Sequence, residues 1–115
     1  MKYMMMLYSE EEVDTISPET FASWLEFQRE AAKHAKRASA DALKPAATAT
    51  VVSVRSGKTI VTDGPFSDTK EQLAGYNVFD CESLDVAIKV ASMIPWATKG
   101  RIEVRPVVDF GEAPG

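Results

Sequence analysis

Cysteine and histidine are almost absent from this sequence, with one of each among 115 residues. A lone cysteine excludes a disulfide framework, and together with a lone histidine it excludes a zinc finger or a Cys/His metal cage within one chain. The sequence also lacks a Gly-x-Gly-x-x-Gly fingerprint, a phosphate-binding Gly-Lys-Ser/Thr loop and a Gly-x-Ser-x-Gly nucleophile elbow. We therefore expect no metal and no cofactor, so that any reaction would be cofactor-independent acid–base chemistry.

Excess positive charge and long apolar runs are missing as well. The chain carries 13 Lys+Arg against 17 Asp+Glu, a net charge of −4, whereas a nucleic-acid-binding surface needs a basic face. The apolar run over residues 3–8 is too short for a secretory h-region or a membrane span. The unpaired Cys81 fits a reducing compartment. We expect a cytoplasmic protein that binds neither nucleic acid nor membrane.

The composition that is present, 45% hydrophobic and 26% charged, is that of one globular domain. A chain of this size can bury about two-thirds of its extended surface, which is enough for a single core. We expect one domain over residues 1–108 and a loose tail over residues 109–115.

The apolar pattern predicts alternating strands and helices. Residues 3–8 are apolar at every position, which is typical of a strand buried on both faces. Ser17 and Pro18 mark a helix start, and the apolar stripe that follows becomes almost all alanine before Pro45, where we expect the helix to end. The other predicted elements are strands over residues 48–55, 58–62, 75–81 and 101–107 and a helix over residues 83–94.

This order predicts a ferredoxin-like α+β fold, with an antiparallel sheet, two helices on one face and an added strand or split hairpin. The other face of the sheet must be polar or covered. Because the first strand is apolar on both faces, we infer a homodimer in which two sheets pack face to face.

One stretch of the sequence resembles a known family. Asp63-Gly64-Pro65-Phe66, followed by Thr-Lys-Glu, resembles the signature of the YCII-related family in its DGPF branch. Residues 1–4, 45–50, 58–62 and 102–106 are similar to other parts of that branch, so the resemblance covers nearly the whole chain. It implies a dimeric α+β barrel of ferredoxin-like subunits.

The resemblance implies little about activity, since most members of the family have no assigned reaction. A relative outside this branch is a dehydrochlorinase of a chlorinated aromatic, with a proposed catalytic His/Asp pair near the start of the first helix. Here that helix start carries Phe21, Trp24 and Phe27, and the single histidine is His34, so the pair cannot be carried over. Relatives have glycine after the first helix, whereas residues 36–44 contain none, which predicts a longer helix.

The signature itself offers two candidate site residues. Asp63 is predicted at a strand end, where its carboxylate either accepts N–H bonds within the turn shaped by Gly64 and Pro65 or serves as a general base. Lys70 either belongs to a solvated loop or neutralises an anionic substrate.

Three further candidates lie on predicted strands. Glu103 and Arg105 share one face of the last strand, where they either form an ion pair or make Arg105 an anion-binding group between the sheets. Tyr76 follows Gly75, which leaves room for a close approach, and its phenol either packs in the core or donates to a substrate oxygen. His34 lies among cationic residues and is predicted to be a surface side chain.

Three functional hypotheses follow. The first is a dimer whose inter-subunit cleft binds a small anionic or aromatic molecule, with Asp63 as base and Arg105 or Lys70 holding negative charge if there is turnover. The second, suggested by the sigma-factor genes that often neighbour the DGPF branch, is a regulatory module that binds an extracytoplasmic-function sigma factor without turnover. The third is a structural dimer with no separate activity.

Overall fold

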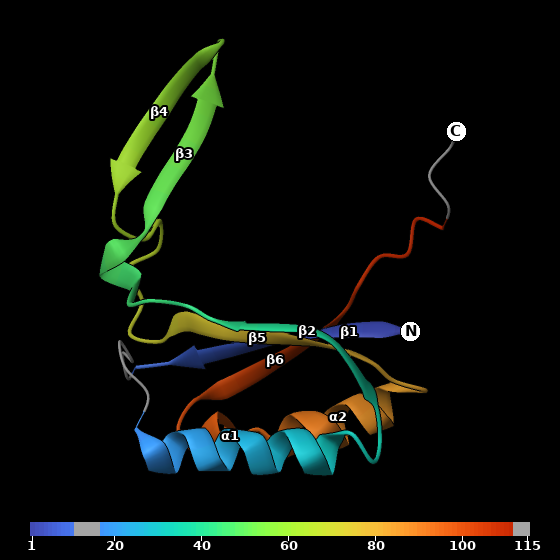
Figure 1. The fold of residues 1–115 in the computed structure, drawn as a ribbon. Helices are drawn as coiled ribbons and strands as arrows, with labels where there is room; N and C mark the ends of the chain where they lie inside the picture. Colours follow the sequence, from blue (N-terminus) through green and yellow to red (C-terminus); the bar gives the residue numbers. More distant parts are fainter. Residues whose placement is uncertain (11–16, 112–115) are drawn as a thin grey trace.

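The protein is described by a computed structural model that covers residues 1–10 and 17–111. It is an α+β fold in which two helices lie on one side of a sheet and a hairpin stands away on the other (Figure 1). The elements are β1 (Lys2–Ser9), α1 (Pro18–Ala31), β2 (Lys36–Ala42), a 3₁₀ turn η1 (Ala46–Thr48), β3 (Thr50–Arg55), β4 (Lys58–Asp63), β5 (Gln72–Asp80), α2 (Leu84–Met93), a 3₁₀ turn η2 (Pro95–Thr98) and β6 (Arg101–Pro106).

The main sheet has the strand order β2-β5-β1-β6, and every neighbouring pair is antiparallel. Met5 in the central strand β1 lies opposite Asn77 of β5 and Val104 of β6. The predicted antiparallel sheet with two helices on one face is confirmed. The tail beyond β6 contains no helix or strand as far as residue 111, and residues 112–115 of the predicted tail lie outside the described part of the chain.

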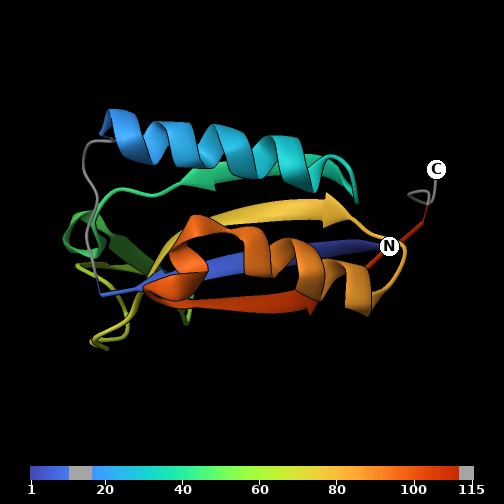
Figure 2. The same cartoon turned by 90° about the horizontal axis from the view of Figure 1, so that it is seen from below.

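The core lies between the sheet and the two helices, which run over one face of it (Figure 2). Alternate residues of β1 point into this core, where Met5 has no exposed surface. Both helix starts were predicted correctly: the side chain of Ser17 accepts from the Thr20 N–H at 3.2 Å, and that of Ser83 accepts from the Val86 N–H at 3.3 Å. The core side chains are Tyr3, Met5, Leu7, Phe27, Ala31, Phe79, Cys81, Ala87, Val90, Ala91 and Ile94.

The prediction that the first helix continues to Pro45 is wrong. Helix α1 ends at Ala31, and residues 36–42 form the edge strand β2, paired with β5. Alanine has the highest helix propensity, so the alanine stripe predicts a helix, but tertiary pairing overrides propensity here. Without β2, the edge of β5 that faces away from β1 would have no strand partner for its backbone groups.

Gly75 explains how closely β2 approaches β5. A Cβ built on Gly75 would lie 2.8 Å from the carbonyl oxygen of Asp41 and 3.2 Å from the Cα of Ala42. The close approach predicted for this glycine is therefore made by backbone, and no other residue fits here without moving β2.

The sheet face away from the helices is open in one chain (Figure 1). We call it the open face; its centre is formed by Met4, Met6, Tyr8, Tyr76 and Val78, which all point away from the core. Met4, Met6 and Tyr8 are half-buried there, so β1 is apolar on both faces, as the sequence predicted, but only one of the faces is covered by helices.

Candidate functional site

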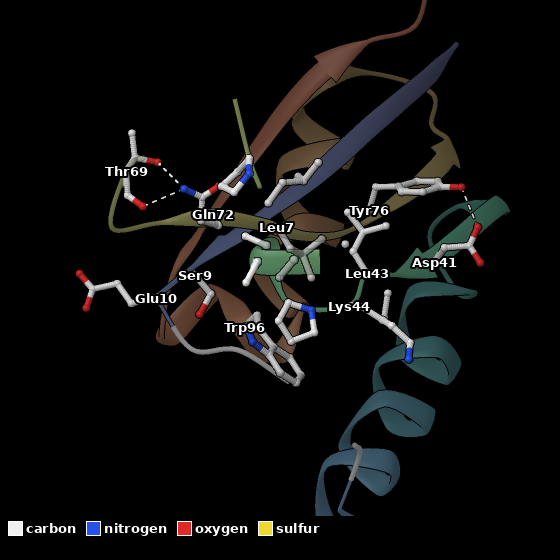
Figure 3. Close-up of a pocket in the computed structure, with 18 of the residues that line it drawn as sticks. Leu7, Ser9, Glu10, Asp41, Leu43, Lys44, Thr69, Gln72, Tyr76 and Trp96 are labelled. Atoms are coloured by element: carbon white, nitrogen blue, oxygen red, sulfur yellow. Dashed lines mark hydrogen bonds between the residues drawn. The ribbon is translucent and has the colours of Figure 1, made fainter. Parts of the chain in front are cut away.

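A cavity of about 440 Å³ lies at the end of the sheet where β1 ends and β5 begins (Figure 3). Its walls come from five parts of the chain: the end of β1, α1, the segment 41–47 with η1, the loop over residues 64–71 with the start of β5, and η2. We call residues 64–71 the signature loop. The cavity therefore depends on the whole fold, since the sheet order brings these segments to one place. We call this cavity the pocket.

Much of the pocket wall is apolar and aromatic. Leu7, Leu43 and Pro45 line it together with Trp24 and Trp96. The two tryptophan rings lie 6.3 Å apart between centroids, so aromatic surface from α1 meets aromatic surface from η2.

The indole of Trp96 has an unsatisfied donor. Its Nε1 atom is buried and has no hydrogen-bond partner within the described part of the chain. A buried N–H usually has a partner, because leaving it unpaired costs about 1–3 kcal/mol. Trp96 is therefore a candidate donor to an acceptor atom of a bound molecule.

Polar groups line the rest of the pocket. The hydroxyl of Tyr76 donates to the Asp41 carboxylate at 2.7 Å, across the pairing of β5 with β2 (Figure 3). This hydrogen bond, together with the negative charge of Asp41, raises the pKa of Tyr76 above its ordinary value. The phenol therefore stays protonated at neutral pH, while Lys44 and Lys70 contribute cationic groups to the pocket lining.

The signature loop is folded around Gln72. Its Nε2 donates to the carbonyl oxygens of Ser67 at 2.8 Å and Thr69 at 2.9 Å, and the Thr69 hydroxyl donates to the carbonyl of Glu71 at 2.8 Å. These bonds close the loop into a compact turn beside the pocket (Figure 3). The loop thereby places Lys70 at the pocket wall.

Asp63, the predicted base, lies elsewhere. It ends β4, pairs with Thr50 of β3 and is exposed, and its carboxylate has no hydrogen-bond partner among residues 1–10 and 17–111. Gly64 adopts a φ of +89° and donates its N–H to the carbonyl of Ala49 at 2.7 Å, which closes the hairpin base. Pro65 lines the pocket, whereas Phe66 is 88% exposed.

Glu103 and Arg105 lie on β6, outside the pocket lining. Ile102 and Val104 pack against the core, so the predicted division of this strand into an apolar and a charged face is confirmed. Arg105 donates to the Glu103 carboxylate at 2.6 Å, which is the ion pair weighed from the sequence. In a single chain the structure thus brings Lys70 and Tyr76 together in the pocket and leaves Asp63, Glu103 and Arg105 outside it; their roles stay predictions.

The pocket residues that sequence reasoning missed include Trp24, Asp41, Lys44 and Trp96. The sequence pattern places Trp24 in a helix stripe and Lys44 at a helix end. Two signals were available in the sequence. Trp96 directly follows the helix stop at Pro95, and Asp41 is a single carboxylate in an alanine-rich segment. Neither signal shows which distant segments meet.

The isolated histidine and cysteine lie outside the pocket lining. His34 is half-buried in the turn after α1, where its backbone N–H donates to the carbonyl of Ala31 at 2.9 Å. Cys81 is buried, and burial raises the pKa of its thiol, with the charge of Asp80 adding to the effect. Over the described ranges, no three His, Cys, Asp or Glu side chains gather as metal ligands, and no helix is long and apolar enough to cross a bilayer.

Two comparisons with known proteins bear on this chain. A family model described as YCII-related domain matches residues 1–111. The chain is also similar to the uncharacterized protein R00369 of Rhizobium meliloti (strain 1021), with 43% identity over 76 residues. That match covers 63% of this chain and 61% of the relative, so the chain spans less than two-thirds of the relative's length.

Proposed function

Since the chain belongs to the YCII-related family, a family without one common assigned reaction, we propose from its own geometry that it binds a small aromatic anion in the pocket. The observation that carries the proposal is the combination of Trp24 and Trp96 with two lysines around a cavity of about 440 Å³, whose lining also includes the carboxylates of Glu10, Asp41 and Asp68. Small-molecule sites are typically apolar cavities of about 300–1,000 Å³ with a few convergent polar groups.

Each part of such a ligand has a matching group in the pocket. An aromatic ring fits against Trp96 and Leu43, and an anionic group fits the charge of Lys44 or Lys70. The unpaired N–H of Trp96 favours a ligand that also presents an acceptor oxygen. Because Asp63 lies outside the pocket of one chain, the proposal is binding rather than turnover.

We also propose that the working form is a homodimer in which a second copy covers the open face. Tyr76 belongs to both the open face and the pocket lining, so a second copy would border the pocket and make it an inter-subunit cleft. Support comes from the apolar centre of that face, where Met4 and Met6 are only half-buried. On the motif Asp63-Gly64-Pro65-Phe66 we further place the chain in the DGPF branch of the family.

A thermal-shift screen tests the binding proposal. Benzoate, salicylate and phenylacetate are compared with the neutral benzamide and with acetate, which lacks a ring. A ligand at 100 times its Kd should stabilise the fold by about 2.7 kcal/mol, which for a domain of this size raises the Tm by roughly 11 °C. We expect the aromatic anions to give clearly larger shifts than benzamide or acetate.

Variants connect the shift to the pocket. Lys70→Gln should lower the affinity for aromatic anions several-fold, and Trp96→Phe should do the same by removing the N–H donor. Lys89→Gln removes the same charge from an exposed position on α2, outside the pocket lining, and should leave the affinity unchanged. Equal effects of Lys89→Gln and Lys70→Gln would contradict the pocket. If no aromatic anion shifts the Tm and a sigma factor is captured instead, the regulatory hypothesis replaces this one.

A further inference from the structure

The hairpin formed by β3 and β4 carries an exposed apolar surface. We call residues 50–63 the arm. Val52 lies opposite Val61 in the β3–β4 register, and Val54 lies two residues further along the same face. These three side chains are 61%, 61% and 57% exposed. The apolar face of the arm is therefore uncovered in a single chain.

An arm of this kind is poorly stabilised by itself. A two-stranded hairpin in water is marginal unless a further strand or packed surface covers it. The main contacts of β3 and β4 are with each other, and the arm is joined to the rest at its base, where Gly64 donates to the carbonyl of Ala49. Figure 1 shows the arm rising well clear of the sheet. The arm is nevertheless regularly paired over six residues of each strand, which indicates that a partner surface stabilises it.

The surface of the whole chain points to the size of that partner contact. The exposed area is 8433 Å², whereas a compact chain of this mass exposes about 6,200 Å², an excess of roughly 2,200 Å². The radius of gyration is 16.4 Å, against about 13 Å for a compact domain of this length. Obligate homodimers bury about 1,000 Å² or more on each partner. The excess surface, to which the exposed tail after β6 also contributes, is large enough to include what one subunit of a stable dimer loses to its partner.

We propose that the arm is a dimer clasp: its Val52, Val54 and Val61 face packs against the second copy that covers the open face, and the arm of that copy packs back in the same way. This inference rests on the proposed homodimer and adds the arm to its interface. The arm and the open face lie on the same side of the chain (Figure 1), so a two-fold rotation engages both surfaces of both copies at once.

The tip of the arm is cationic. The arm tip carries Arg55 and Lys58, whereas the chain as a whole has a net charge of −4. A cationic tip suits a carboxylate-bearing patch on the copy that it reaches. The same two cations discourage strand addition along the exposed edges of the arm.

Sedimentation velocity on the full chain, over a concentration series, tests the clasp. The double variant Val52→Asp/Val61→Asp places two charges on the apolar face, and we expect it to raise the dimer Kd about 100-fold or more, since buried unpaired charge is strongly unfavourable. Ser53→Asp/Thr62→Asp adds the same charges to the same two strands on the opposite face and should leave the Kd within about threefold. Circular dichroism confirms that each variant keeps its fold.

A third variant separates the clasp from the dimer itself. Met6→Asp charges the open face and should also dissociate the dimer. An unchanged Kd for Val52→Asp/Val61→Asp, alongside dissociation by Met6→Asp, would overturn the clasp and leave the dimer standing. A wild-type chain that stays monomeric at every concentration would overturn both. Equal weakening by the arm variant and its opposite-face control would also overturn the clasp, because the apolar face would then have no special role.

Hydrogen exchange on the wild-type chain gives a measurement that does not depend on a variant. Backbone amides of β3 and β4 should exchange slowly above the dimer Kd and much faster below it, because dilution uncovers the arm. Exchange in the arm that does not change with concentration would overturn the clasp.

Discussion

Replacing Gly75 with alanine should destabilise the edge of the sheet and the pocket together. The new methyl group would lie 2.8 Å from the Asp41 carbonyl oxygen and 3.2 Å from the Cα of Ala42, and both are backbone atoms that cannot rotate away. Strand β2 must therefore move outward. Overpacking of this kind costs about 1–3 kcal/mol, which for a 115-residue domain lowers the Tm by about 4–12 °C.

The assay is thermal unfolding followed by circular dichroism, with aromatic-anion binding measured on the same samples. Gly57→Ala provides a matched control, because nothing lies within 4 Å of the added methyl group and only the local φ of +74° is strained. The control should cost about 1–2 kcal/mol, because an L-residue is disfavoured at a positive φ, and should leave ligand affinity unchanged. A Gly75→Ala protein with the wild-type Tm would refute the close β2–β5 approach on which this reasoning depends.

Two further predictions concern titratable groups. In a tyrosinate absorbance titration the pKa of Tyr76 should lie above its ordinary value, and Asp41→Asn should lower it, because the hydrogen bond and the negative charge are both lost. Since the pKa of Tyr76 is raised in the folded state, its contribution to stability is present below pH 10 and is lost as the pH rises through the raised value. A tyrosine titration that is unaffected by Asp41→Asn would contradict the hydrogen bond between Tyr76 and Asp41. Cys81 should react slowly with a thiol reagent in the folded protein and quickly in urea, because it is buried and its pKa is raised by burial; equal rates in both states would show that the thiol is accessible.

Local signals in the sequence were sufficient for much of the fold. Ser17 and Ser83 are helix caps whose effect reaches only three residues along the chain, so their positions could be predicted directly. The hairpin turn at Ser56 and Gly57 is local as well, and both residues adopt positive φ angles.

Pairing between distant segments could not be predicted in the same way. Residues 36–42 are rich in alanine and became a strand only because β5 offers an open edge to them. The pocket depends on the same kind of meeting, since Trp24 and Trp96 are 72 positions apart in the sequence and lie with their ring centroids 6.3 Å apart. Neither residue carries a local signal for the other.

The strand order also sets the time at which this chain can fold during its synthesis. Strand β1 ends at Ser9, but its first partner β5 begins at Gln72 and its second, β6, at Arg101. A ribosome that adds about 5–20 residues per second needs roughly 3–13 s to make the 63 positions from Ser9 to Gln72. Throughout that interval the apolar residues of β1 have no sheet to join, so they are the part of the nascent chain that is most exposed to aggregation.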